Sequence, residues 1–258
     1  MPLKQILKKL LSRLSQDEPE LSPEDRPHYQ PGRAFDVPHY EDITRCRLEH
    51  LRSMNLPVDG KRVLDLGAGI GRLSEFFVER GCDVFCVDAR PENIQKLREL
   101  YPGRKAAVVD MEKDDLQSLG EFEIVFCYGL LYHVVDVMGM LKRAAAVCKE
   151  MMLIETCIAP IHANGLFLAR ENPRDVTQAM YGFGSRPSPA YVTTCLELCG
   201  FSHVYAPRRL PDHPQFKYEV SDNPAHWHRE RNTRDIFIAS RSACGQPELI
   251  ARPSLRKI

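Results

Sequence analysis

Short apolar runs alternate with amphipathic stretches through the middle of this chain. Apolar runs at about 62–66, 83–87, 106–109, 123–127 and 151–156 predict strands. Between them, apolar residues recur every three to four positions at about 70–80, 91–100 and 135–149, which predicts helices. Strands that alternate with helices in this way indicate a parallel sheet that is covered on both faces.

Further elements flank this alternating region. Residues 38–55 predict a helix with an apolar stripe, and "SPAYVTTCLELCGF" predicts another that starts at Ser188 and ends at Gly200. The runs "HVYAP" and "RDIFIAS" predict two final strands. The expected fold class is therefore α/β, with a doubly wound, mostly parallel seven-stranded sheet and an N-terminal helical extension.

Two segments depart from the regular pattern. Residues 157–186 have little periodicity and several glycines, which predicts a loop or lid near the end of a sheet strand. Residues 3–14, "LKQILKKLLSRL", predict a short basic amphipathic helix, followed by an acidic, proline-rich linker. We expect this helix to dock on the domain or on a second subunit, with a membrane surface as the less favoured alternative. The expected organisation is helix and linker at 1–37, a main domain at 38–242 containing the lid, and a tail at 243–258.

Composition narrows the classes of partner. The 35 basic residues balance 35 acidic ones, so no overall field attracts nucleic acid or an anionic membrane. Nine cysteines without a Cys-x-x-Cys pair predict reduced thiols, a cytoplasmic location and no metal site. No apolar run has the length of a membrane span, and the N-terminus lacks the pattern of a signal peptide.

Candidate ligand-binding residues follow three predicted strands. The first strand ends in Asp65-Leu-Gly67-Ala-Gly69-Ile-Gly71, the second ends at Asp88, and the third ends at Asp110 followed by Met111. Ligands of open parallel sheets bind at the carboxyl ends of strands. Alternating glycines allow close approach of the backbone, a carboxylate at Asp88 can accept hydrogen bonds from ribose hydroxyls, and the Asp110-Met111 pair can meet an adenine.

The spacing of the glycine loop separates two classes of nucleotide. The pyrophosphate fingerprint is Gly-x-Gly-x-x-Gly, whereas this loop is Gly-x-Gly-x-Gly with an acid two residues before it. A carboxylate at Asp65 would repel a pyrophosphate but could assist an α-ammonium group. The alternative without a ligand is that the glycines serve tight packing and Asp88 caps a helix.

Together these residues resemble the class I S-adenosylmethionine-dependent methyltransferase superfamily. The resemblance implies S-adenosyl-L-methionine as cofactor, held by Asp65, Gly67, Ala68, Gly69, Gly71, Asp88, Ala89, Asp110, Met111 and Gly129. The stretches "GLLYH" and "LIET" further resemble the bacterial enzymes that transfer a carboxymethyl group from carboxy-S-adenosyl-L-methionine to the wobble uridine of tRNA. That narrower resemblance implies that Tyr132 helps to recognise the donor's carboxylate. Because the N-terminal stretch is short and acidic and the net charge is zero, tRNA is the alternative partner.

The carboxyl end of the fourth predicted strand supplies the candidates for chemistry. His133 is the first candidate general base because its intrinsic pKa suits neutral pH, although it could instead be hydrogen bonded to backbone beneath the cofactor. Tyr132 and Glu155 are further catalytic candidates. Weaker candidates for the base or the substrate pocket are His162, Tyr181, Phe183, Arg186 and the run His226-Trp227-His228.

These residues support three functional hypotheses. The leading one is O-directed methyl transfer to a small-molecule or glycan acceptor. The alternatives are a tRNA wobble-uridine (carboxy)methyltransferase and a catalytically inactive nucleotide-binding module.

Overall fold

The structure is a computed structural model that describes residues 35–223 and 232–253. The chain divides into two units, residues 1–30 and 31–258, and all described residues belong to the second. The helix expected at 3–14, its linker and the run His226-Trp227-His228 lie outside the described residues, as do the last five residues of the expected tail.

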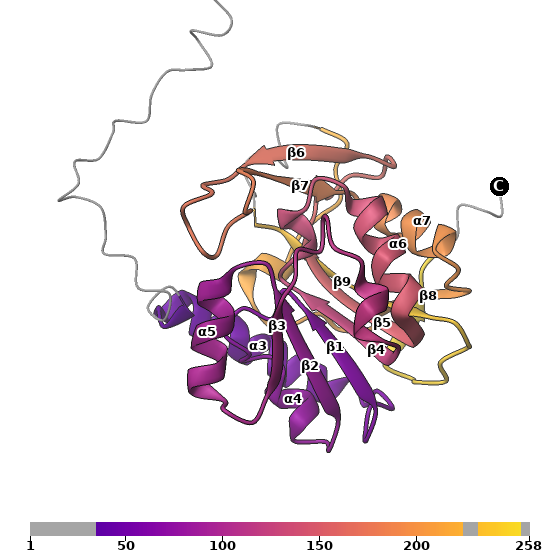
Figure 1. The fold of residues 1–258 in the computed structure, drawn as a ribbon. Coiled ribbons are helices and arrows are strands. Elements are labelled where there is room, and N and C mark those ends of the chain that lie inside the picture. The colour runs from indigo at the N-terminus through magenta and orange to yellow at the C-terminus, as the bar shows by residue number, and fades with distance from the viewer. Residues whose placement is uncertain (1–34, 224–231, 254–258) are drawn as a thin grey trace, which may run out of the picture. The chain divides into compact units, whose positions relative to one another are not determined.

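An eight-stranded sheet forms the centre of the second unit, in the order β10-β8-β9-β5-β4-β1-β2-β3 (Figure 1). The five strands β3, β2, β1, β4 and β5 are parallel to one another. At the other side of the sheet, β9 is antiparallel to β5, β8 is antiparallel to β9, and β10 is antiparallel to β8. The bounds are β1 (Arg62–Leu66), β2 (Asp83–Asp88), β3 (Lys105–Val108), β4 (Phe122–Tyr128), β5 (Cys148–Cys157), β8 (His203–Pro207), β9 (Arg234–Ser240) and β10 (Leu249–Ala251). The expected fold class is confirmed, with β10 as an additional edge strand.

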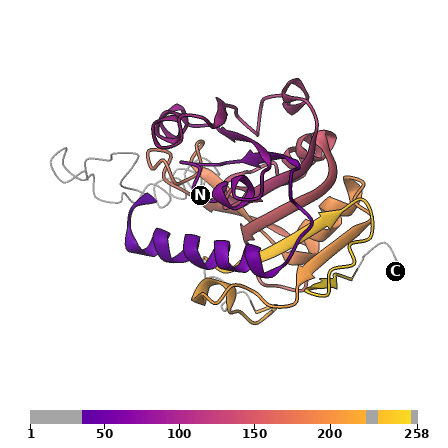
Figure 2. The same cartoon turned by 90° about the horizontal axis from the view of Figure 1, so that it is seen from below.

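Helices cover both faces of the sheet (Figures 1 and 2). One hydrophobic cluster joins the sheet to α3 (Pro38–Ser53), α4 (Glu75–Val78) and α5 (Pro91–Leu100), and a second joins the opposite face to α6 (Val137–Val147) and α7 (Pro189–Leu198). Alternation along β1 explains the division, since Val63 packs in the first cluster while Leu64 and Leu66 pack in the second. Short 3-10 turns lie at η1 (Leu116–Leu119), η2 (Leu131–His133) and η3 (Pro214–Phe216).

The predicted helix at 70–80 is wrong in extent, because α4 holds only four residues. Gly71 has a φ of 84°, which keeps the backbone out of the helical region, and Gly81 at φ 69° ends the segment. The turns between them still bury Phe76 and Phe77 in the core.

The segment expected to be a loop at 157–186 contains a hairpin of its own. β6 (Leu166–Arg170) and β7 (Phe183–Pro187) pair antiparallel in a separate two-stranded sheet. The hairpin contacts η2, which follows the carboxyl end of β4, so the lid lies at the end of the parallel strands where ligands are expected (Figure 1). We call residues 171–182, between β6 and β7, the lid loop.

Candidate active site

Two adjoining cavities lie at the carboxyl ends of β1, β2 and β4, on either side of the glycine loop. The first, the lid cavity, extends beneath the lid loop. The second, the helix cavity, extends toward α3. Both cavities are lined by Gly67, Gly69 and Gly129, and by Phe35 and Tyr40.

Most of the residues expected from the sequence line these cavities. The lid cavity is lined by Gly67, Gly69, Asp88, Ala89, Asp110, Met111, Gly129 and His133, and the helix cavity by Gly67, Ala68, Gly69, Gly129 and Tyr132. The lining of neither cavity includes Asp65, Gly71 or Glu155. At Gly71 an added Cβ would lie 3.0 Å from Leu97, so this glycine allows the close packing of α5.

Asp88 is held rigidly at the end of β2. Its carboxylate accepts hydrogen bonds from the backbone N–H of Gly69 at 2.9 Å, from the N–H of Arg90 at 2.9 Å and from the Asn93 amide at 3.1 Å. The side chain therefore links the glycine loop to the start of α5 while one side faces the lid cavity. A carboxylate fixed in this way is preorganised to accept hydrogen bonds from a diol.

Asp65 occupies a different environment although it lies on the neighbouring strand. It is buried beneath the loop and accepts a hydrogen bond of 2.5 Å from the Ser74 hydroxyl. Burial raises the pKa of Asp65 to about 7, although Ser74 and Arg104 oppose the shift. Direct contact with an α-ammonium group therefore remains a prediction, and the hydrogen bond to Ser74 shows that Asp65 stabilises the turn.

Hydrogen bonds hold the lid loop at two places beside the lid cavity. Near the carboxyl end of β3, the Tyr181 hydroxyl donates a hydrogen bond to Asp110, and Lys113 Nζ lies 3.7 Å from the same carboxylate. Near Asp88, Arg90 donates to the carbonyl oxygens of Pro173 and Gln178, each at 3.1 Å. The lid loop is thus held against the cavity by contacts with residues that follow β2 and β3.

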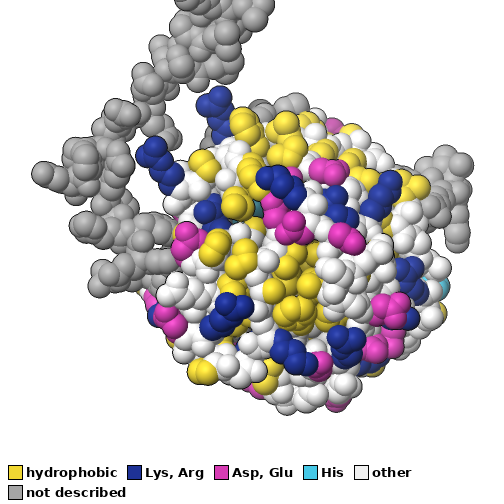
Figure 3. Space-filling model, viewed as in Figure 1, with side chains coloured by type: hydrophobic (Ala, Val, Ile, Leu, Met, Phe, Trp, Pro, Cys, Tyr) yellow, Lys and Arg dark blue, Asp and Glu magenta, His cyan; other side chains and the backbone are white. Residues whose placement is uncertain are grey.

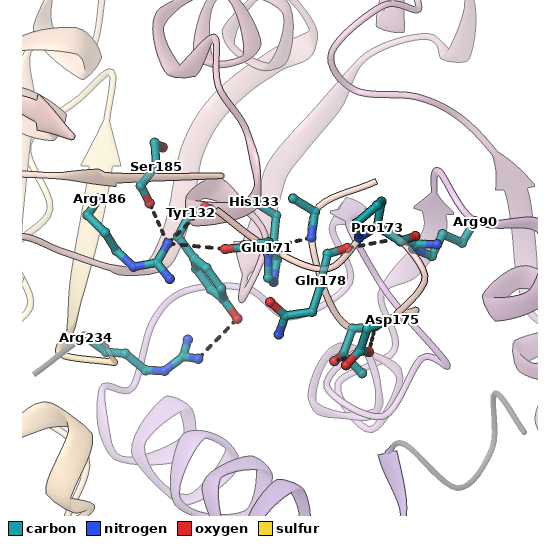
Figure 4. A network of polar contacts seen from close by, with 12 residues as sticks. Arg90, Tyr132, His133, Glu171, Pro173, Asp175, Gln178, Ser185, Arg186 and Arg234 are labelled. Atoms are coloured by element: carbon teal, nitrogen blue, oxygen red, sulfur yellow. Dashed lines mark hydrogen bonds and ion pairs between the residues drawn. The ribbon is translucent and has the colours of Figure 1, made fainter. Parts of the chain in front are cut away.

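A polar network centred on Glu171 includes His133, which follows the carboxyl end of β4 (Figure 4). His133 Nδ1 pairs with Glu171 of the lid loop, and the same carboxyl group lies 3.4 Å from Arg186 Nη1 on β7. Burial lowers the pKa of His133, and Glu171 offsets this only in part. The guanidinium groups of Arg186 and Arg234 lie 5.3 and 4.8 Å from the centre of the Tyr132 ring, and Arg234 Nη2 donates to the tyrosine hydroxyl at 3.1 Å. The environment favours a neutral imidazole that faces the lid cavity.

Glu155 lies between two buried arginines. Arg47 Nη2 of α3 donates to one carboxylate oxygen at 2.8 Å, and Arg234 Nη1 of β9 donates to the other at 2.9 Å. Burial alone would raise the pKa of Glu155, but Arg234 and Arg47 hold it below its usual value. A carboxylate stabilised in this way is a poor proton acceptor. Its contacts instead suit a residue that holds the two arginines in position.

Residues that the sequence reasoning missed line the helix cavity. Arg47 is 5% exposed, and within the described ranges no hydrogen bond reaches its Nε or the hydroxyl of buried Tyr128. One signal for Arg47 was available, since Ile43, Arg47 and Leu51 have i, i+4, i+8 spacing and share the buried face of α3. A charged residue in an apolar helical stripe indicates a polar site beneath it.

The weaker candidates fall in two places. Tyr181 lines the lid cavity, and Arg186 contacts the polar network around Glu171. Phe183 is outside the lining and 43% exposed. His162 pairs with Asp222 at an exposed position away from both cavities.

Other features restrict what the described part of the chain can bind. Across residues 35–223 and 232–253, no helix has the length and apolar character needed to cross a membrane, and no group of three or more His, Cys, Asp or Glu could hold a metal ion. All nine cysteines are free. On the face shown in Figure 3, basic and acidic side chains are interspersed.

Comparison with protein families gives one extended match. A family model described as a methyltransferase domain matches residues 39–205. Curated relatives include the ubiquinone biosynthesis O-methyltransferases of Bordetella avium (strain 197N), 32% identical over 42% of this chain and 46% of the relative, and of Dechloromonas aromatica (strain RCB), 33% identical over 47% and 53%. The chain spans about half the length of the curated relatives it matches.

Solved structures match over more of the chain at lower identity. The N-terminal domain of EvdMO1 with SAH bound has a TM-score of 0.59 at 19% identity and covers 94% of this chain and 98% of its own. An S-adenosylmethionine dependent methyltransferase from Mesorhizobium loti has a TM-score of 0.53 at 19% identity, covering 76% and 98%. At these identities the likeness concerns the fold.

Proposed function

We propose that this chain, which belongs to the methyltransferase domain family, transfers a methyl group from S-adenosyl-L-methionine to an oxygen atom of a small-molecule acceptor. The observation that carries the proposal is that a preorganised Asp88 and a buried, neutral His133 line the same cavity. The O-directed activity of the curated relatives supports the choice of acceptor atom.

The two cavities suggest how the donor would be held. In this proposal adenosine occupies the lid cavity, with its ribose hydroxyls donating to Asp88 and its adenine beside Asp110 and Met111. The amino-acid end would occupy the helix cavity, where Arg47 and Tyr128 offer donors to a carboxylate. The three glycines shared by the cavities leave room for the sulfonium between them.

In the proposed reaction, the acceptor oxygen attacks the methyl carbon as the bond from that carbon to sulfur breaks. The electron pair of that bond stays on sulfur, which becomes the neutral thioether of S-adenosylhomocysteine. His133 takes the proton of the acceptor hydroxyl, which requires the imidazole to be neutral at the start. The protein contributes mainly alignment of the three reacting atoms and removal of this proton.

The choice of a small acceptor rests on charge and access. The lid loop roofs the lid cavity, and acidic and basic side chains are interspersed on the face in Figure 3, whereas binding of tRNA depends on neutralising many phosphates. Glycan acceptors carry the same hydroxyl chemistry and remain within the proposal. Nine free thiols support a reducing compartment such as the cytoplasm.

Calorimetry with two ligands tests the assignment of the cavities. S-adenosylhomocysteine fills both proposed subsites, whereas methylthioadenosine lacks the amino-acid end. We expect Asp88→Ala to weaken both ligands about 10- to 100-fold, because it removes charged hydrogen bonds to the ribose. We expect Arg47→Met to weaken S-adenosylhomocysteine about tenfold and to leave methylthioadenosine unchanged.

Matched controls are available on the same elements. Asp83 begins β2 at its other end, and Arg45 is 59% exposed on α3, so Asp83→Ala and Arg45→Met should bind both ligands like the wild type. Failure of the wild-type protein to bind S-adenosylhomocysteine would refute the proposed function. Equal losses for both ligands in Arg47→Met, in protein that keeps the wild-type unfolding transition, would refute the placement of the amino-acid end.

A further inference from the structure

We propose that Glu171 of the lid loop is the positioning residue for His133, which fixes the imidazole as the tautomer that carries its proton on Nδ1 and presents the lone pair of Nε2 to the acceptor. The catalytic meaning of this pair rests on the proposed function. The tautomer itself is a property of the protein alone and is tested without an acceptor.

The contacts of Glu171 show a carboxylate that is fixed from several sides. Its side chain is only 3% exposed, and Oε2 accepts a hydrogen bond from the backbone N–H of Ala179 at 2.7 Å as well as pairing with His133. Arg186 Nη1 lies 3.4 Å from Oε1 and also donates to the carbonyl oxygen of Tyr132 at 3.3 Å (Figure 4). The carboxylate therefore has little freedom to turn away from the imidazole.

The chemistry of the pair determines where the proton lies. An ionised carboxylate can only accept hydrogen bonds, so the His133 nitrogen that faces it must carry a hydrogen. A neutral imidazole has one such hydrogen, which leaves Nε2 unprotonated and able to accept a proton. Within the described residues, the side chain of His133 has Glu171 as its hydrogen-bond partner.

The charge states of both groups agree with this arrangement. Burial would raise the pKa of Glu171, but His133, the Ala179 N–H and Arg186 together bring it below its usual value. Burial lowers the pKa of His133, and the positive charges of Arg234 and Arg186 lower it further against the effect of Glu171. The pair is therefore a carboxylate and a neutral imidazole near pH 7.

The two partners belong to different parts of the fold. His133 lies in η2 after β4, whereas Glu171 begins the lid loop and is held beside it by the approach of β7 to η2. At Gly184 of β7, an added Cβ would lie 2.2 Å from the Tyr132 carbonyl oxygen and 2.7 Å from Glu171 Oε1. The pair thus forms when the hairpin is seated as described, so base orientation is coupled to lid position.

Nuclear magnetic resonance of the full chain labelled with 15N-histidine tests the proposal. At pH 7 we expect the His133 signals, assigned by their loss in His133→Gln, to show a protonated Nδ1 and an unprotonated Nε2. Glu171→Leu removes the acceptor, and we expect loss of this tautomer in favour of the one protonated on Nε2. Glu171→Asp keeps a carboxylate and should retain the wild-type tautomer in the larger share of molecules.

The exposed pair of His162 and Asp222 supplies a matched control. Asp222→Asn should alter the His162 signals and leave those of His133 unchanged. Binding of S-adenosylhomocysteine by Glu171→Leu shows that this variant is folded, and if its affinity is lost, the tautomer measured in the wild type decides the outcome. A wild-type His133 protonated on Nε2, or a wild-type tautomer retained in folded Glu171→Leu, overturns the proposal, whereas absent binding of S-adenosylhomocysteine by the wild type overturns only the proposed function.

Discussion

At the scale of single residues, two buried aspartates on neighbouring strands differ in the hydrogen bonds that offset the effect of burial on their pKa values. Asp88 receives three N–H donors and lines the lid cavity, whereas Asp65 receives one hydroxyl and lies beneath the loop. Burial raises the pKa of both carboxyl groups, that of Asp65 to about 7. Asp65 therefore titrates in the physiological range, with consequences for stability.

The free energy of unfolding should show this titration. Because the pKa of Asp65 is near 4 in the unfolded chain and about 7 in the folded one, the stabilisation from its protonated form is complete below about pH 4 and is lost as the pH rises to about 7. Relative to Asp65→Asn, the wild type should lose up to about 4 kcal/mol of unfolding free energy over this range. Urea denaturation at pH 5, 6, 7 and 8 measures the difference.

The exposed Asp83 at the start of β2 is the control, since Asp83→Asn should show no such trend. A difference between wild type and Asp65→Asn that stays constant from pH 5 to 8 would mean that the Asp65 carboxyl group is ionised throughout.

Single residues also show how far the sequence could predict the site. The glycine loop, Asp88, Asp110 and His133 follow strand ends, and the parallel topology brings strand ends together, so their convergence was predictable. Arg47 and Glu171 come from a preceding helix and an insertion, whose placement depends on packing. Only the position of Arg47 in an apolar stripe gave a local signal.

At the scale of elements, the strands were predictable where burial in the hydrophobic core requires apolar residues. β1, β8 and β9 have the expected bounds because their apolar residues pack between helices. The hairpin β6–β7 was missed because it is a two-stranded sheet at the surface, with Leu168 63% exposed, and so lacks the burial that produces a periodic pattern. β10 has three residues and is paired on one side only.

The seating of this hairpin depends on the absence of a side chain at Gly184. Gly184→Ala would place a Cβ against backbone, so we expect a loss of about 1–3 kcal/mol in the free energy of unfolding and a displacement of β7 from η2. Denaturation and the His133 signals measure the two effects. Gly103, where a Cβ meets nothing within 4 Å, gives the control Gly103→Ala, and equal stability of the two variants would contradict this account of the hairpin.

At the scale of the whole described unit, the lid loop connects the three places where a nucleotide and its acceptor would be held. It contacts Arg90 after β2, Asp110 after β3 and His133 after β4. Because these contacts hold the lid loop against the lid cavity, we expect them to set the rate of ligand entry more than the affinity.

Tyr181→Phe tests this expectation. The variant keeps the ring but loses the hydroxyl that bonds to Asp110, a contact worth about 1 kcal/mol, so association and dissociation of S-adenosylhomocysteine should each become about fivefold faster. Surface plasmon resonance with immobilised protein measures both rates. Tyr205→Phe, at a hydroxyl that accepts from Cys244, should leave them unchanged, and a slower association in Tyr181→Phe would contradict a gating role.

The buried triad of Arg47, Glu155 and Arg234 has a consequence for where this domain can be divided. The family match ends at residue 205, but the second cation of the triad is supplied by β9, which also separates β5 from β8 in the sheet. A fragment cut at the family boundary would leave a half-neutralised carboxylate in the core and an unpaired central strand edge. We therefore expect the smallest autonomous folding unit to extend at least through Ser240, beyond residue 205 where the family match ends.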